Sequence, residues 1–393
     1  MWKKVLIGVI LITGLTVYFF GFALRGRDIT GLINVSSEGE TINLDLYPKS
    51  FYGLEEILDK YDVYLMGENR GSKASYELNK YMAKYFVENK GVKYIVIDSG
   101  HSYAQYLNKY LETGDKKILE FLLQHIPEST DGMRVSQDEI ELMRFYYELN
   151  SNLPQDKKIK FVGIGVESAT VISLNYLNSI LQNKNIDPEI KPFIDKIKES
   201  KNSPKFFTED INHYFKNYGS KIKSSLGKDY FDFKIVIDNL QGAFAGSLYD
   251  KTLMNNFKGQ YANLPEGKYY GQLGMFHTDN MKNFDSSITN SSYSSFAHDL
   301  NIGFNQTRGK VFTLNYLYSG GKELYSNMPQ NNDDLIAFPR ILGTSYKIYN
   351  STRDYKAFTT IKSWTQGKFA DEWFVIINNS PAAGRYKNQF TLK

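Results

Sequence analysis

The stretch that decides the fold is VYLMGENR, residues 63–70. Val63 to Met66 form a short, continuous apolar run, which is typical of a strand buried on both faces of a parallel sheet. Glu68 and Arg70 follow it within four residues. Because ligands of open α/β sheets bind at the carboxyl ends of the strands, polar residues in this position are candidate site residues. The stretch therefore predicts a buried strand with a functional loop at its end.

The same pattern recurs along the chain. Further apolar runs predict buried strands at 94–97, 159–164, 269–276, 311–317 and 373–377. Amphipathic helical patterns lie between them, at 74–86, 102–112, 115–126, 136–150 and 171–183. Residues 189–262 are rich in helical patterns and contain no clear strand, which indicates a helix-rich insertion. Strands that alternate with helices predict the α/β class, with a mostly parallel sheet and flanking helices.

The N-terminus carries a long uncharged segment. Val5 to Leu24 is a run of 20 residues without a charged side chain. A helix of that length spans roughly 30 Å, which matches the hydrocarbon thickness of a bilayer. Lys3 and Lys4 precede it, which favours a single transmembrane helix with its N-terminus inside. The alternative is a cleaved signal peptide, for which residues 21–23 offer a weak site.

These observations predict three parts of the chain. Residues 1–28 form a membrane anchor, residues 29–41 a polar tether, and residues 42–393 one α/β domain. We expect a single-pass protein of the cell membrane, in contact with the bilayer through residues 5–24, whose C-terminal domain is extracytoplasmic.

Charge and composition exclude several classes of function. The formal net charge is +4, and the four basic residues that flank the apolar segment account for it, leaving 43 basic and 43 acidic residues. A neutral body gives no general attraction to nucleic acid, so we expect no nucleic-acid partner. The absence of cysteine excludes disulfides, thiolate nucleophiles and cysteine–zinc sites. Serine-hydrolase, zinc-protease and P-loop motifs are also absent, and we expect no cofactor and no metal.

Polar residues follow four of the predicted strands. Glu68, Asp98, Glu167 and His277 lie at or near the ends of the first four runs, and Arg70 lies two residues after Glu68. If these strand ends meet, carboxylates and a histidine can exchange protons, and an arginine can stabilise an oxyanion. An acid after a strand can instead cap a helix, which is a purely structural role.

Several short motifs, in their order and spacing, resemble the erythromycin esterase family. They are LMGENRG (65–71) with the helix after it, 94–98, AQYLNKY (104–110) with Gly114-Asp115, YDKTLMNN (249–256), residues 267–277 and, faintly, NNSPA (378–382). The resemblance covers most of residues 50–385. It implies an α/β fold with a helical cap and an active site at the strand ends.

The resemblance also implies roles for individual residues. Members of the family hydrolyse a macrolide lactone with a glutamate and a histidine on one loop and a second histidine at a later strand end. Glu68 matches the glutamate, and His277 matches the later histidine. Asp98 lies where the family usually has glutamate, and Arg70 replaces the loop histidine.

Arg70 decides between the functional hypotheses. An arginine stays protonated near neutral pH and cannot act as a general base. We therefore favour a non-catalytic or altered-activity protein that binds an unknown small-molecule ligand at the strand ends. The alternative is an esterase-like hydrolase in which Glu68, Asp98 or His277 is the base and Arg70 binds an anionic group or oxyanion. A third hypothesis, a surface scaffold, predicts that these residues do not converge. We expect Asp98 to end the strand next to that of Glu68.

Overall fold

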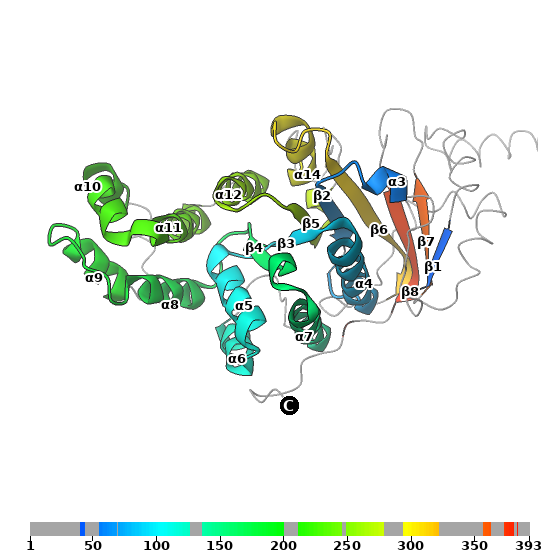
Figure 1. Cartoon of the computed structure of the whole chain (residues 1–393), viewed down its shortest axis with the longest axis horizontal. Coiled ribbons are helices and arrows are strands. Elements are labelled where there is room, and N and C mark those ends of the chain that lie inside the picture. Colours follow the sequence, from blue (N-terminus) through cyan, green and yellow to red (C-terminus); the bar gives the residue numbers. More distant parts are fainter. Residues whose placement is uncertain are drawn as a thin grey trace, which may run out of the picture.

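The computed structural model describes residues 40–43, 55–68, 70–125, 136–199, 211–245, 249–278, 294–321, 357–362, 373–380 and 383 (Figure 1). Within these ranges, no helix is both long enough and apolar enough to cross a bilayer. The expected membrane segment at residues 5–24 lies outside them, as does the tether up to residue 39.

An eight-stranded sheet organises the chain, with the strand order β1-β7-β8-β6-β2-β5-β3-β4. All neighbours from β8 to β4 are parallel, whereas β7 is antiparallel to both β1 and β8. The predicted α/β fold with a mostly parallel sheet is therefore confirmed. The strands are β1 (Glu40–Asn43), β2 (Val63–Glu68), β3 (Val92–Ile97), β4 (Lys160–Gly163), β5 (Lys268–Gly274), β6 (Val311–Gly321), β7 (Ala357–Lys362) and β8 (Trp373–Ser380).

Helices connect the strands and cover both faces of the sheet (Figure 1). The predicted helix-rich insertion at 189–262 corresponds to α9–α12, which together with α8 separate β4 from β5. The helices are α3 (Glu55–Leu58), α4 (Lys73–Lys90), α5 (His101–Thr113), α6 (Lys116–His125), α7 (Gln137–Asn152), α8 (Thr170–Leu181), α9 (Lys191–Glu199), α10 (Ile211–Leu226), α11 (Tyr230–Ala245), α12 (Tyr249–Asn263), α13 (Met275–Thr278) and α14 (Phe296–His298).

The side chains of β2 explain the two layers. Tyr64 and Met66 pack on one face with the core of α4, α5, α6 and α7, whereas Val63 and Leu65 pack on the other with α12 and α14. Successive residues of a strand point to opposite faces, so a strand covered on both sides must be apolar throughout. Helices α8–α11 form a separate hydrophobic core, and in Figure 1 they extend beyond the β4 edge of the sheet.

Side-chain amides form hydrogen bonds with the backbone groups at the free edge of β4. The Asn108 side chain on α5 accepts a hydrogen bond from the Phe161 N–H (2.7 Å) and donates one to the Phe161 carbonyl (3.0 Å). Asn256 on α12 donates to the carbonyl of Ile164, just after the strand (2.8 Å). An edge strand otherwise exposes unpaired backbone groups. These contacts therefore hold α5 and α12 at the end of β4.

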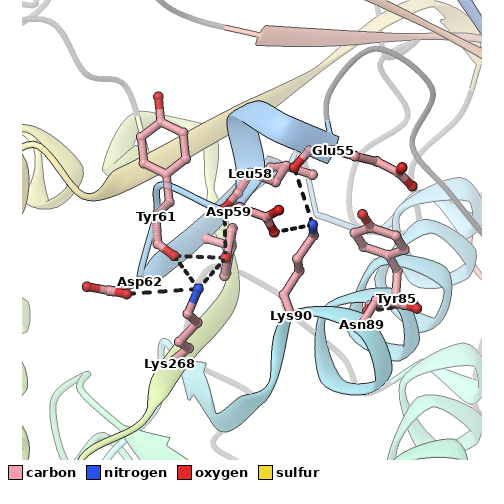
Figure 2. Close-up of polar contacts among 10 residues, drawn as sticks. Glu55, Leu58, Asp59, Tyr61, Asp62, Tyr85, Asn89, Lys90 and Lys268 are labelled. Atoms are coloured by element: carbon pink, nitrogen blue, oxygen red, sulfur yellow. Dashed lines mark hydrogen bonds and ion pairs between the residues drawn. The ribbon is translucent and has the colours of Figure 1, made fainter.

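The amino ends of the strands carry a polar cluster with no part in the candidate site (Figure 2). The Lys268 ammonium, at the start of β5, donates to the Tyr61 carbonyl (2.8 Å) before β2. Lys90, at the end of α4, donates to the Glu55 carbonyl (3.3 Å) and pairs with Asp59. These contacts attach the α3–β2 segment to β5 and α4, and they leave the carboxyl ends of the strands as the place for chemistry.

Candidate functional site

Glu68 is placed by a close approach of β2 to β6. A Cβ atom at Gly67 would lie 1.9 Å from Oδ1 of Asn315, so only glycine fits before the glutamate. Asn315 is itself fixed, because its Oδ1 accepts a hydrogen bond from the Thr278 hydroxyl (2.6 Å). The end of β2 therefore has little freedom to move.

Glu68 lies in a polar network that extends across β5. The Gln272 amide donates to Glu68 Oε2 (2.8 Å) and accepts from the Tyr316 hydroxyl (3.0 Å). Burial raises the pKa of Glu68 from 4.5 to about 7, against the opposing effects of Arg70 and Gln272. A carboxyl with such a pKa is partly protonated at neutral pH and can give or take a proton.

Arg70 and Asp98 form an ion pair. Nη2 of Arg70 donates to Oδ2 of Asp98, and the hydroxyl of Tyr249 donates to Oδ1. The Asp98 side chain is 6% exposed and that of Arg70 36% exposed. Burial alone would lower the pKa of Arg70, but Asp98 and Glu68 outweigh it and raise that pKa. The guanidinium thus stays charged, which excludes Arg70 as a base.

The expectation that Asp98 ends the strand next to that of Glu68 is wrong. Strand β5 lies between β2 and β3. Arg70 lies two residues after Glu68 and has a long side chain. It therefore still reaches Asp98, across the end of β5.

A third carboxyl, Glu139, also interacts with Arg70. It lies in the first turn of α7, where its N–H donates to the Ser136 hydroxyl (2.9 Å). Burial raises the pKa of Glu139, and Arg70 opposes that rise. No sequence pattern marked Glu139 as a site residue, since acidic residues are common in the first turn of helices for electrostatic reasons.

His277 forms an oriented pair with Asp250. Its Nδ1 lies 3.0 Å from both carboxylate oxygens of Asp250, whose side chain is 2% exposed. The N–H of Phe296 also donates to Asp250 (2.9 Å). Among the described residues, Nε2 of His277 has no hydrogen-bond partner, and the side chain is 20% exposed. Because Nδ1 is engaged by Asp250, Nε2 is the ring nitrogen left to accept a proton or a ligand contact.

The electrostatics of His277 link the pair to the rest of the site. Burial lowers the pKa of His277, but the hydrogen bond and charge of Asp250 outweigh it, and the net shift is upward. Asp98 adds to the rise and Arg70 opposes it. The ring of Tyr249 lies 5.3 Å from that of His277, centroid to centroid. Arg70 thus links the four residues expected from the sequence at the carboxyl ends of the strands, because it interacts electrostatically with Glu68, Asp98 and His277.

Glu167 does not join them. It is 3% exposed and accepts hydrogen bonds from the Ser102 N–H (2.9 Å), the Ser102 hydroxyl and the Ser173 hydroxyl (2.6 Å). Ser102 lies in the first turn of α5, whose unpaired N–H groups attract a carboxylate. The expectation that Glu167 shares the site is wrong, because this carboxylate caps a helix.

Sequence reasoning missed Tyr249 and Asp250 as site residues. They are the first two residues of α12 and belong to one of the segments that carried the family resemblance. No strand end precedes them, so the rule that found the other residues does not apply to them. In the part of the chain that the structure describes, no group of three or more histidine, aspartate and glutamate side chains is arranged to hold a metal ion.

Comparison with known proteins gives structural matches only. No family model and no curated protein matches the chain. A His-to-Asn mutant of the erythromycin esterase EreC, in its open conformation, matches with a TM-score of 0.60 and 14% identity over 90% of this chain and 100% of that one. The fold is similar to that of an erythromycin esterase.

Two further structures match to the same extent. A protein from Bacillus cereus has a TM-score of 0.64 and 14% identity over 91% of this chain and 99% of that one. A succinoglycan biosynthesis protein has a TM-score of 0.60 and 14% identity over 91% and 98%. At this identity, the similarity establishes the erythromycin-esterase-like α/β fold and not an activity.

Proposed function

We propose that this chain is a hydrolase of the esterase type that works by acid–base catalysis at the carboxyl ends of β2, β3 and β5. The observation that carries the proposal is the His277–Asp250 pair, in which a buried carboxylate holds Nδ1 and leaves Nε2 as the ring nitrogen that can act as a base. A base oriented by a carboxylate is the recurring arrangement for activating a nucleophile.

Each residue has its own role in the proposed reaction. Nε2 of His277 takes a proton from water as the water oxygen attacks the ester carbonyl, and Asp250 stabilises the imidazolium that forms. Arg70 offers positive charge to the oxyanion or to an anionic group of the substrate. Glu68 gives its proton to the alcohol oxygen as the C–O bond breaks, since its pKa of about 7 keeps part of it protonated.

The proposal fixes the shape of the pH–rate profile. His277 must be neutral to act as a base, and its pKa is raised, so the rate increases with pH through that pKa. Glu68 must be protonated, so the rate decreases as pH rises past about 7. A bell-shaped profile with a narrow maximum near neutral pH is the expected result.

A second candidate function is ligand binding without turnover. The Arg70–Asp98 ion pair favours it, because the arginine that replaces the family's loop histidine is engaged with a neighbouring carboxylate. In this case the same residues hold an unknown small molecule and release it unchanged.

We further propose that residues 5–24 anchor the protein in the cell membrane, with the α/β domain on the extracytoplasmic side. The proposal rests on the 20-residue uncharged run and the basic residues before it. The ligand or substrate then comes from outside the cytoplasm.

The experiment is a steady-state assay of the full-length chain against a panel of aryl, alkyl and lactone esters. His277→Asn should lower kcat/KM by roughly 100-fold or more, the usual contribution of a general base. Asp250→Asn should lower it less, because the imidazole remains. The matched control is His125→Asn on α6, whose ring Nδ1 bonds the Phe121 carbonyl (2.8 Å), away from the site. Absence of turnover on every ester would exclude the hydrolase and leave the binding protein, whereas equal activity of His277→Asn would exclude His277 as the base.

A further inference from the structure

Helix α12 begins with two consecutive residues that serve different halves of the site. The hydroxyl of Tyr249 bonds Asp98, the partner of Arg70. The carboxylate of Asp250 bonds His277. The first turn of α12 thus contacts both Asp98, which holds the proposed anion-binding Arg70, and His277, the proposed base.

Asp98 has no freedom left once both contacts are made. One of its oxygens accepts from Tyr249 and the other from Arg70, and the side chain is 6% exposed. A buried carboxylate is stable only while its oxygens are hydrogen-bonded. Without the phenol hydroxyl, Asp98 can rotate towards other donors, and Arg70 then loses the partner that fixes its guanidinium.

Helix α12 is itself held along its length. Asn256 donates to the carbonyl of Ile164 after β4, and Gln260 contacts the His101 ring at the start of α5. Tyr249, Asn256 and Gln260 are spaced at 7 and 4 residues, which places them on one helical face. These contacts hold α12 across the ends of β3 and β4, and they therefore fix the position of Tyr249.

We infer that Tyr249 is a positioning residue, whose hydroxyl holds Asp98 and through it keeps Arg70 in register with His277. The inference rests on the proposed function for its catalytic consequence, but the contact itself has a consequence without catalysis. Tyr249→Phe removes only the hydroxyl and keeps the ring that lies 5.3 Å from the His277 ring.

The first test measures how Arg70 is held, with no substrate. Phenylglyoxal modifies arginine side chains, and peptide mass spectrometry gives the rate at Arg70 itself. Tyr249→Phe should raise that rate several-fold, because the guanidinium is less firmly paired. The matched control is Tyr261→Phe on the same helix, whose ring stacks on Tyr269 5.7 Å away. Equal modification rates in the wild type and Tyr249→Phe, with an unchanged melting temperature, would overturn the inference.

The second test is a double-mutant cycle on ester hydrolysis. Tyr249→Phe should lower kcat/KM about tenfold in the wild-type background, the scale of one hydrogen bond to a charged group. In an Arg70→Ala background the same change should have little further effect, because Tyr249 acts through Arg70. An undiminished tenfold loss there would show that Tyr249 acts independently of Arg70. If no ester is hydrolysed at all, the proposed function fails, whereas a faster modification of Arg70 would still support the positioning role.

Discussion

The guanidinium of Arg70 pairs with the carboxylate of Asp98, although the strands that these residues follow are not neighbours in the sheet. The pair crosses the end of β5 and joins the loop after β2 to the loop after β3. Its two sides differ in accessibility, because the Asp98 side chain is 6% exposed and the Arg70 side chain 36% exposed. A ligand from solvent therefore meets the arginine, while the aspartate supports it from inside.

Arg70→Ala should lower the melting temperature. The change leaves the Tyr249 hydroxyl donating to Asp98 but removes the guanidinium donor, and it removes the positive charge near Glu68. Because the arginine is partly exposed and its charge is screened, we expect a loss of roughly 1–2 kcal/mol rather than the larger loss typical of a fully buried pair. The control is Arg308→Ala, an arginine whose Nε donates to the Ile302 carbonyl in an exposed contact. Unchanged melting temperatures for both Arg70→Ala and Glu68→Ala would exclude a stabilising ion pair.

Glu68→Gln should change how stability depends on pH. The pKa of Glu68 is raised from 4.5 to about 7, so the folded state binds this proton more tightly than the unfolded state. The stability contributed by the protonated carboxyl is fully present below about pH 4.5 and is lost as pH rises through about 7. The glutamine variant does not lose this stability. Its free energy of unfolding should therefore rise relative to that of the wild type, by on the order of 2 kcal/mol between pH 5 and 8.

Urea denaturation of both proteins across that range measures the difference. Glu139 and His277 also have raised pKa values, so only the difference between variant and wild type isolates Glu68. A difference that stays constant with pH would mean that Glu68 does not titrate in this window.

The sequence was most informative where strands are buried on both faces. The apolar runs at 63–66 and 94–97 lie within β2 and β3, and the run at 159–164 contains β4, all in the parallel part of the sheet. Strands β1 and β7 were missed because ETIN and AFTTIK are short and lack a continuous apolar run, as expected at an antiparallel edge. The order of the strands depends on pairings between distant segments, which no local pattern encodes.

The site was predictable only where a strand end marks it. Glu68, Asp98 and His277 follow strands, so the rule for α/β sheets found them. The same rule also selected Glu167, which caps α5, because a carboxylate at a strand end is equally suited to a helix N-terminus. Asp250 lies in a helix, so the rule for strand ends does not select it. The i, i+7 spacing of Tyr249 and Asn256 does place those two residues on one face of α12.

Glu167→Ala should destabilise the protein more than any change in the site. It removes the acceptor for three hydrogen bonds from two serines and leaves the N-terminus of α5 without its buried anion. We expect a loss of about 3 kcal/mol in a urea melt, and a smaller loss for Glu167→Gln, which keeps one acceptor oxygen. The exposed Glu112 near the other end of α5 is the control. Activity or ligand binding per folded molecule should not change, and a selective loss of either with normal stability would return Glu167 to the site.

The N-terminal segment should hold the protein in the membrane without the help of charge. A helix of about 20 apolar residues partitions into the bilayer through the hydrophobic effect, so neither high salt nor carbonate extracts it. Full-length protein with a C-terminal tag should stay in the membrane pellet after both washes, and protease added outside intact cells should digest the α/β domain. A chain that begins at residue 29 is the matched control and should be found in the soluble fraction.

Recovery of a shortened, soluble form from cells that express the full-length chain would instead establish the cleaved signal peptide. Protection of the domain from external protease would contradict the proposed orientation, because the basic Lys3 and Lys4 would then lie outside.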